Sequence, residues 1–211
     1  MSLINVLLHG DAAYVAVDTA VIQFDTGAVF EGSKMVPMPS AGIVVAGQGT
    51  PDLIYHFAMS MVTCLRQMDF DAIQDASPGI DDWFRRVDAF YASQGKPDAS
   101  PAHSGQRIVV AGWSMREQRM AGIQFNRPPG ADTSFEVDRI EGQLHTPAYD
   151  DDLSGLTVAT PEDYMRAVAE AQMRTHRKHK SQPVLGGRLI VAELRRSQVI
   201  VSDLGPILVR G

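Results

Sequence analysis

The sequence predicts an α+β protein built as a four-layer α/β/β/α sandwich, in which two antiparallel sheets face each other and helices flank them. Short apolar runs joined by tight turns fill the first third, which favours antiparallel pairing. Two helical patterns follow, and then come more strands, one helix and a last pair of strands. Helices inserted between groups of antiparallel strands indicate stacked layers, and we expect a single domain over residues 1–211.

The first third contains only predicted strands. Val, Ile, Phe and Tyr dominate it, and Gly or Asp-Thr-Gly steps punctuate it. The apolar start is too short to span a membrane and has no basic leader, so we interpret it as a mature strand. The predicted strands are INVLLH (4–9), AYVAVDTAVIQF (13–24), AVFEG (28–32), KMVPM (34–38) and AGIVVAGQG (41–49).

Two helices are predicted next. Thr50 can cap the first, and apolar residues then recur at helical spacing over 53–68. Ser77-Pro78-Gly79 breaks the chain, so the second helix is expected from Ile80 to Ser93. We expect its apolar residues to share one side; they are Trp83, Phe84, Val87, Phe90 and Tyr91.

The second half alternates again between strands and a helix. A third helix begins at Thr160, which forms a candidate capping box with Asp163 and precedes a proline suited to the first turn. Its basic end, 174–180, complements the helix C-terminus. The predicted strands are 107–115, 119–126 and 134–140, followed after the helix by a hairpin of 188–194 and 198–204.

Composition limits the classes of function. The net charge of −6 argues against a nucleic-acid binder and against a protein held to anionic membranes by charge. Cys64 is the only cysteine, so no internal disulfide is possible, and we expect a cytoplasmic protein or one inside an intracellularly assembled particle. The histidines form no metal-ligand pattern and no phosphate-binding loop appears, so no metal or cofactor is expected.

Spacing within the first strands carries a more specific signal. Asp18 follows Ser2 by sixteen residues, and Lys34 follows Asp18 by sixteen more. With the Ala-Gly ending of the strand at Gly47 and the later stretch GGRLIVAELRRSQV, this pattern resembles the N-terminal nucleophile hydrolase superfamily. More narrowly, it resembles the proteasome β-subunit and its bacterial peptidase relatives.

The resemblance implies a catalytic site formed by Ser2, Asp18, Lys34 and Gly47, on condition that Met1 is removed. Ser2 would be the nucleophile, and its free α-amine, with a pKa of about 8, would be the base. Lys34 would favour the developing alkoxide, Asp18 would hold Lys34 charged, and the Gly47 amide would face the oxyanion. If Met1 stays, the free amine belongs to Met1 and the base is lost.

Each of these residues also has a simpler explanation. Ser2 can be a small residue after an initiator methionine, and Asp18 can simply enter an Asp-Thr turn. Lys34 can be a solvated lysine at a strand edge, and Gly47 a turn glycine. The joint spacing of Ser2, Asp18 and Lys34 raises these three residues above background, whereas both explanations of Gly47 can hold.

The chain also departs from the family pattern. Gln182 and Leu185 stand where the family places an Asp and a Ser before its Gly-Gly step, and Ser154-Gly155 poorly replaces its Ser-Gly-Ser element. We therefore expect a catalytically degenerate protein, used as a structural component of a homo-oligomer or larger assembly such as a viral particle. The alternative is an active peptidase or amidase with Ser2 as nucleophile. A third possibility is a protein that binds a peptide or small ligand in the cleft.

Overall fold

The structure is a computed structural model that describes residues 2–22, 26–49, 51–64, 69–95, 105–130, 134–154, 156–178 and 185–208. Met1, the predicted cap Thr50, residues 65–68 of the first predicted helix, Gly155 and Gln182 lie outside the described residues. Within the described part the helices are α1 (Pro51–Cys64), α2 (Phe70–Ala76), α3 (Ile80–Ser93) and α4 (Pro161–Lys178).

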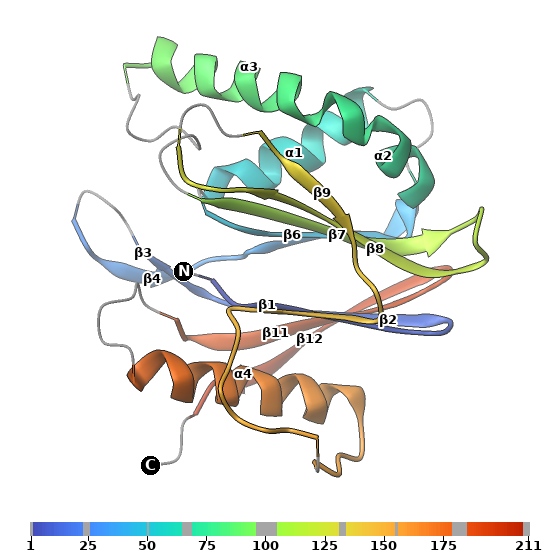
Figure 1. The fold of residues 1–211 in the computed structure, drawn as a ribbon, viewed down its shortest axis with the longest axis vertical. Coiled ribbons are helices and arrows are strands. Elements are labelled where there is room, and N and C mark those ends of the chain that lie inside the picture. Colours follow the sequence, from blue (N-terminus) through green and yellow to red (C-terminus); the bar gives the residue numbers. More distant parts are fainter. Residues whose placement is uncertain are drawn as a thin grey trace.

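Two antiparallel sheets lie face to face (Figure 1). The β1 sheet has the order β10-β1-β2-β11-β12, and the β6 sheet the order β5-β6-β7-β8-β9. The strands of the β1 sheet are β1 (Ile4–His9), β2 (Ala12–Asp18), β10 (Gln143–Thr146), β11 (Arg188–Arg195) and β12 (Gln198–Pro206). The strands of the β6 sheet are β5 (Met35–Met38), β6 (Ile43–Gln48), β7 (Gln106–Ser114), β8 (Arg119–Arg127) and β9 (Glu136–Arg139).

Helices cover both outer faces of this pair of sheets. Helices α1, α2 and α3 lie over the β6 sheet, and α4 lies under the β1 sheet (Figure 1). A small separate ribbon of β3 (Ala20–Ile22) and β4 (Val29–Glu31) projects at one side. The predicted four-layer α/β/β/α sandwich is confirmed.

Alternation along the strands divides the core into layers. On β7, Ile108 and Val110 pack beneath the helices, whereas Val109 and Ala111 face the other sheet. Every residue of β2 is buried, because one of its faces meets the β6 sheet and the other meets α4. Burying each large aliphatic side chain stabilises the fold by about 1.5–3 kcal/mol. The packed layer between the two sheets therefore holds the ends of their strands in fixed positions relative to one another.

Local signals set the helix boundaries. Thr160 Oγ1 accepts a hydrogen bond from the Asp163 amide at 3.1 Å and donates one to Asp163 Oδ2 at 2.9 Å, so a capping interaction begins α4 as predicted. The second predicted helix, now α3, has the predicted bounds. Phe90 was placed wrongly on its buried side: it is 50% exposed, because it lies off the stripe formed by Phe84 and Tyr91.

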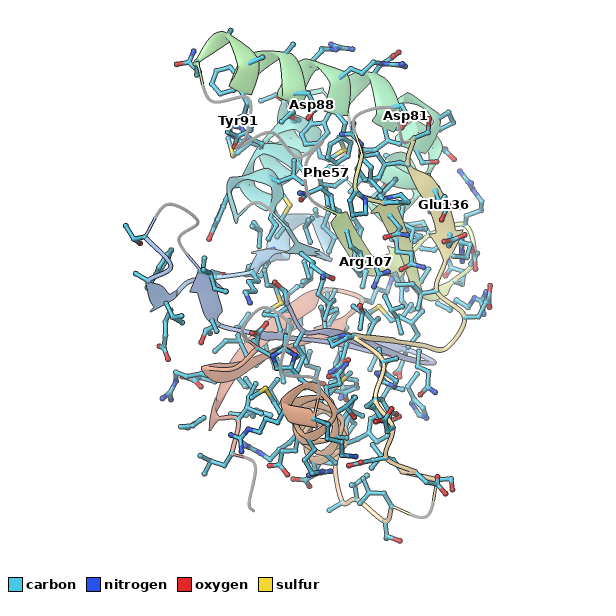
Figure 2. All side chains as sticks on the ribbon, turned by 60° about the vertical axis from the view of Figure 1, so that its left-hand side comes forward. Phe57, Asp81, Asp88, Tyr91, Arg107 and Glu136 are labelled. Carbon is cyan, nitrogen blue, oxygen red and sulfur yellow. The ribbon has the colours of Figure 1, made fainter. Side chains whose placement is uncertain are left out.

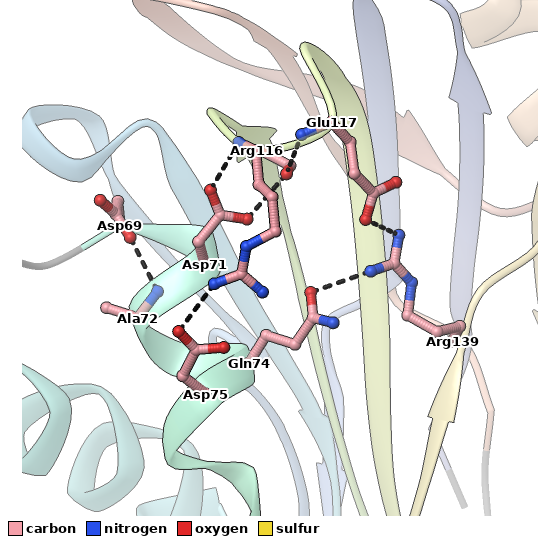
Figure 3. Close-up of polar contacts among 9 residues, drawn as sticks. Asp69, Asp71, Ala72, Gln74, Asp75, Arg116, Glu117 and Arg139 are labelled. Carbon is pink, nitrogen blue, oxygen red and sulfur yellow. Dashed lines mark hydrogen bonds and ion pairs between the residues drawn. The ribbon is translucent and has the colours of Figure 1, made fainter.

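Sequence patterns did not predict α2 or β10. Asp69 caps α2 by accepting from the Ala72 amide at 2.8 Å. A polar network then ties α2 to the turn between β7 and β8 (Figure 3). In it Asp71 accepts from the Ser114 hydroxyl at 2.7 Å and from the Arg116 amide at 3.0 Å. Both contacts join residues that are far apart in sequence, so no local sequence pattern predicts them.

Candidate functional site

An ion pair forms at the end of the sandwich where β2 terminates. Lys34 Nζ lies 2.8 Å from Asp18 Oδ1. Asp18 is fully buried and Lys34 is 6% exposed. Asp18 is the last residue of β2 and Lys34 directly precedes β5, so the pair joins the two sheets.

The start of the chain is bound to the same carboxylate. The Leu3 amide donates to Asp18 Oδ1 at 2.8 Å, and Leu3 itself is fully buried. Ser2, one residue earlier, is 7% exposed. The Ser2–Leu3 peptide bond therefore lies beside the Asp18–Lys34 pair. The catalytic site that the resemblance implies for these residues stays a prediction.

The Gly-Gly step completes the surroundings of Asp18. The Gly186 amide donates to Asp18 Oδ2 at 3.1 Å, so both carboxylate oxygens are engaged. Gly187 has a φ of +77°, and a Cβ there would lie 2.4 Å from Thr19 Oγ1. Only glycine fits this conformation at such close approach.

Burial and the ion pair act on Lys34 in opposite directions. Desolvation lowers the pKa of the Lys34 ammonium, while the charge and the hydrogen bond of Asp18 raise it, and the net shift is downward. Replacing such a buried pair by apolar side chains of similar size is often neutral or stabilising. The presence of the Asp18–Lys34 pair therefore gives little support to the view that the pair serves only to stabilise the fold.

The Gly47 amide is committed to strand pairing. It donates to the Lys34 carbonyl at 3.0 Å, because β6 runs beside β5. A Cβ at Gly47 would lie 2.4 Å from Ile54 of α1, so helix packing also requires a glycine here. In this arrangement the amide does not point to an oxyanion beside Ser2.

An open pocket of about 350 Å³ adjoins the ion pair. It is lined by Val17, Thr19, Glu31, Gly32, Ser33, Lys34 and Ile190. The pocket leads from the surface to the Lys34 side chain, so a ligand could approach the ion pair from there.

The departures from the family pattern have a structural counterpart at Leu185. This side chain is 4% exposed and packs in the apolar layer between the β1 sheet and α4. It cannot hydrogen bond to a nucleophile. Ser154 is exposed in the loop before α4. Among the described residues no cluster of His, Cys, Asp or Glu could hold a metal ion.

Sequence patterns did not predict a second cationic site at this end of the sandwich. Arg107, the second residue of β7, lies between the two sheets and lines another pocket. The alternation of side chains along the strand was the only feature that could have predicted it. Arg107 lies on the same strand face as Val109 and Ala111, which are buried against the other sheet.

Comparison with solved structures shows the fold. The chain is similar to Anbu, described as an ancestral beta-subunit, from Yersinia bercovieri, with a TM-score of 0.59, 13% identity and coverage of 97% of this chain and 88% of that one. It is also similar to an Anbu (Gly-1) mutant from Hyphomicrobium sp. strain MC1, with a TM-score of 0.61, 10% identity and coverage of 97% and 87%. No model of a known protein family and no curated protein sequence matches the chain.

Proposed function

We propose that this proteasome-subunit-like protein is an assembly component whose N-terminal site is catalytically silent. The commitment of the Gly47 amide to the Lys34 carbonyl carries this proposal. Acyl transfer needs a donor aimed at the tetrahedral oxyanion, and removing one such donor typically costs about 10²–10³ in kcat. The apolar Leu185 beside the Gly-Gly step supports the same conclusion.

The helical surface over the β6 sheet supports an assembly role. Tyr55, Met59 and Val62 of α1 are 46%, 60% and 47% exposed, and their spacing places them on one face of the helix. We call them the α1 apolar stripe. Resemblance to the proteasome family implies contact between subunits through these helices. None of the helices that the structure describes has the length and apolar character needed to cross a membrane.

Particle size tests the assembly role. We expect the native protein to sediment as a complex several times heavier than the 23.0 kDa chain. Val62→Asp should shift it toward the monomer, because a charge in an apolar interface is strongly unfavourable. Val201→Asp is the matched control, since Val201 of β12 is also 47% exposed but lies on the other sheet. A monomeric wild-type protein, or equal effects of the two substitutions, would contradict the proposal.

A second candidate, hydrolysis by Ser2, is favoured by one observation. Asp18 holds both Lys34 and the Leu3 amide at 2.8 Å, so the Ser2 backbone and a buried ammonium are fixed to the same carboxylate. A free amine on Ser2 could then act as the base. Oxyanion stabilisation would have to come from a group other than the Gly47 amide.

Intact-mass analysis separates the two candidates. Hydrolysis predicts that the mature protein begins with Ser2 and that an electrophile directed at N-terminal nucleophiles labels this serine. Loss of the label in Ser2→Ala and in Lys34→Met would then support hydrolysis and reject a silent site. Retained Met1, or a trimmed protein that stays unlabelled and does not cleave a peptide library, would support the silent assembly component. Circular dichroism of each variant controls for folding.

A further inference from the structure

Arg107 spans the space between the two sheets at the start of β7. Figure 2 shows it between the sheets, below the layer that contains Phe57. Its guanidinium donates from Nη1 to Thr146 Oγ1 of β10, in the opposite sheet. It also donates from Nη2 to Asn126 Oδ1 of the neighbouring β8, at 3.4 Å. Arg107 is therefore anchored at both ends of the inter-sheet gap by uncharged acceptors.

Among the described residues, Arg107 has no carboxylate in contact. Its Nε atom is buried and has no hydrogen-bond partner there. Arg127, which lines the same pocket, differs, because its Nη1 lies 3.0 Å from Asp88 Oδ2. Arginine pairs best with a carboxylate through two parallel N–H groups, and no described residue offers Arg107 that acceptor.

The surroundings of Arg107 are positive and polar. The adjoining pocket holds about 340 Å³, and its described lining includes the side chains of Gln48, Asn126 and Thr146 but no acidic residue. Desolvation lowers the pKa of Arg107, and only Asp138 opposes that shift. Arginine stays protonated nevertheless, so the guanidinium keeps a charge that no described carboxylate contacts.

The pocket belongs to the same end of the sandwich as the Asp18–Lys34 pair. Arg107 pairs with Gln48, the residue after Gly47. Thr146 pairs with Ile4 in the neighbouring strand. Ile4 follows Ser2 by two residues, which corresponds to about 7 Å of extended chain. A ligand bound by Arg107 would therefore extend along the strand ends toward Ser2.

We propose that the Arg107 pocket binds a peptide carboxylate, either an acidic side chain or a C-terminal carboxylate. The carboxylate supplies a counter-charge that no described residue brings into contact with the guanidinium, and the pocket volume suits one side chain or chain end. The net charge of −6 disfavours a nucleic-acid phosphate as the occupant. The proposal concerns binding alone and holds whether the Ser2 site is silent or active.

Calorimetric titration of the full-length chain tests the proposal with three unlabelled pentapeptides. The first is acetylated and amidated with a central glutamate, the second has glutamine instead, and the third is an acetylated alanine peptide with a free C-terminus. We expect the glutamine peptide to bind at least about 10-fold more weakly than the better of the other two, as for a lost charge-assisted hydrogen bond. Whichever carboxylate peptide binds identifies the source of the carboxylate.

Substitutions then assign the binding to Arg107. Arg107→Gln should weaken the preferred peptide about 10-fold or more, and Arg107→Lys should weaken it less, because charge remains while the two-pronged geometry is lost. Arg85→Gln, at an exposed arginine of α3, should leave affinity unchanged. A glutamine peptide that binds as tightly as both carboxylate peptides, no binding of any peptide at millimolar concentration, or unchanged affinity in a folded Arg107→Gln protein would each overturn the proposal. Sedimentation of the same samples reports on assembly separately.

Discussion

Lys34 and Arg107 are cations at the same end of the sandwich, but their surroundings differ. Lys34 is buried against Asp18, whose carboxylate also accepts from two backbone amides. Arg107 contacts only neutral acceptors among the described residues and leaves a buried N–H group unsatisfied there. One charge is neutralised within the fold, whereas the other faces a pocket.

This difference distinguishes an internal structural pair from a binding group. A charge removed from water needs a nearby opposite charge, and a protein can supply it from its own chain or from a guest. Asp18 joins β1, β2, β5 and the Gly-Gly step, so Lys34 is part of the connection between sheets. Among the residues that the structure describes, Arg107 contacts no carboxylate, which is the basis for the proposal that a ligand supplies one.

The largest effect is expected for Asp18→Asn. The substitution leaves the Lys34 ammonium buried without a counter-charge, and breaking a buried pair in this way costs about 3–5 kcal/mol. Urea unfolding measures the loss. Asp75→Asn, which disrupts the exposed pair with Arg116, is the control and should change the free energy of unfolding far less. Equal losses in the two variants would show that Asp18 does not hold Lys34 in solution.

A pH series on Lys34→Met sharpens the comparison further. Burial lowers the Lys34 pKa below its ordinary value of 10.5, so between the folded pKa and 10.5 the unfolded chain binds more protons. The wild-type free energy of unfolding should therefore gain relative to that of Lys34→Met as pH rises through this window. Urea unfolding of both proteins between pH 7 and pH 10.5 measures the difference. A pH-independent difference would contradict the lowered pKa.

Arg107→Gln should have the smallest effect on stability. It removes a charge that lacks a carboxylate together with two hydrogen bonds to neutral groups, so the free energy of unfolding should change by less than about 1 kcal/mol. Thr146→Val is a useful partner substitution, because it removes one acceptor and keeps the charge, and it should cost about 1 kcal/mol or more. A loss above about 3 kcal/mol for Arg107→Gln would indicate that a counter-charge lies next to Arg107, and it would contradict the contrast between Arg107 and Lys34.

The sequence predicted the parts of the fold that depend on local patterns. Most apolar strands, the α3 boundaries after Ser77-Pro78-Gly79 and the interaction of Thr160 with Asp163 follow from neighbouring residues. The single strand predicted over 13–24 was wrong, because it divides into β2 and β3, which lie in different sheets. Two elements escaped prediction. Helix α2 has only seven residues and is held to the β6 sheet by contacts with the β7–β8 turn, and β10 is a short, largely polar strand whose register comes from β1.

The candidate site was predictable only in part. The spacing of Ser2, Asp18 and Lys34 resembles the family pattern, and that resemblance implied that the three residues lie together; the Leu3 amide and Lys34 both contact Asp18. The engagement of the Gly47 amide could not be foreseen, because it depends on how β5 pairs with β6. Arg107 belongs to no motif, and its partners lie on other strands, so only its alternation with Val109 marked it.

The strand order also bears on biosynthesis. Asp18 of β2 pairs with Leu189 of β11, so these two strands are neighbours although they lie near opposite ends of the sequence. While the ribosome is still synthesising α4, the nascent β1–β2 hairpin has an open edge and an uncovered apolar face, the kind of surface that chaperones shield. Gly186 reaches Asp18 only once this late segment has emerged, so the carboxylate acquires its full set of donors near the end of translation.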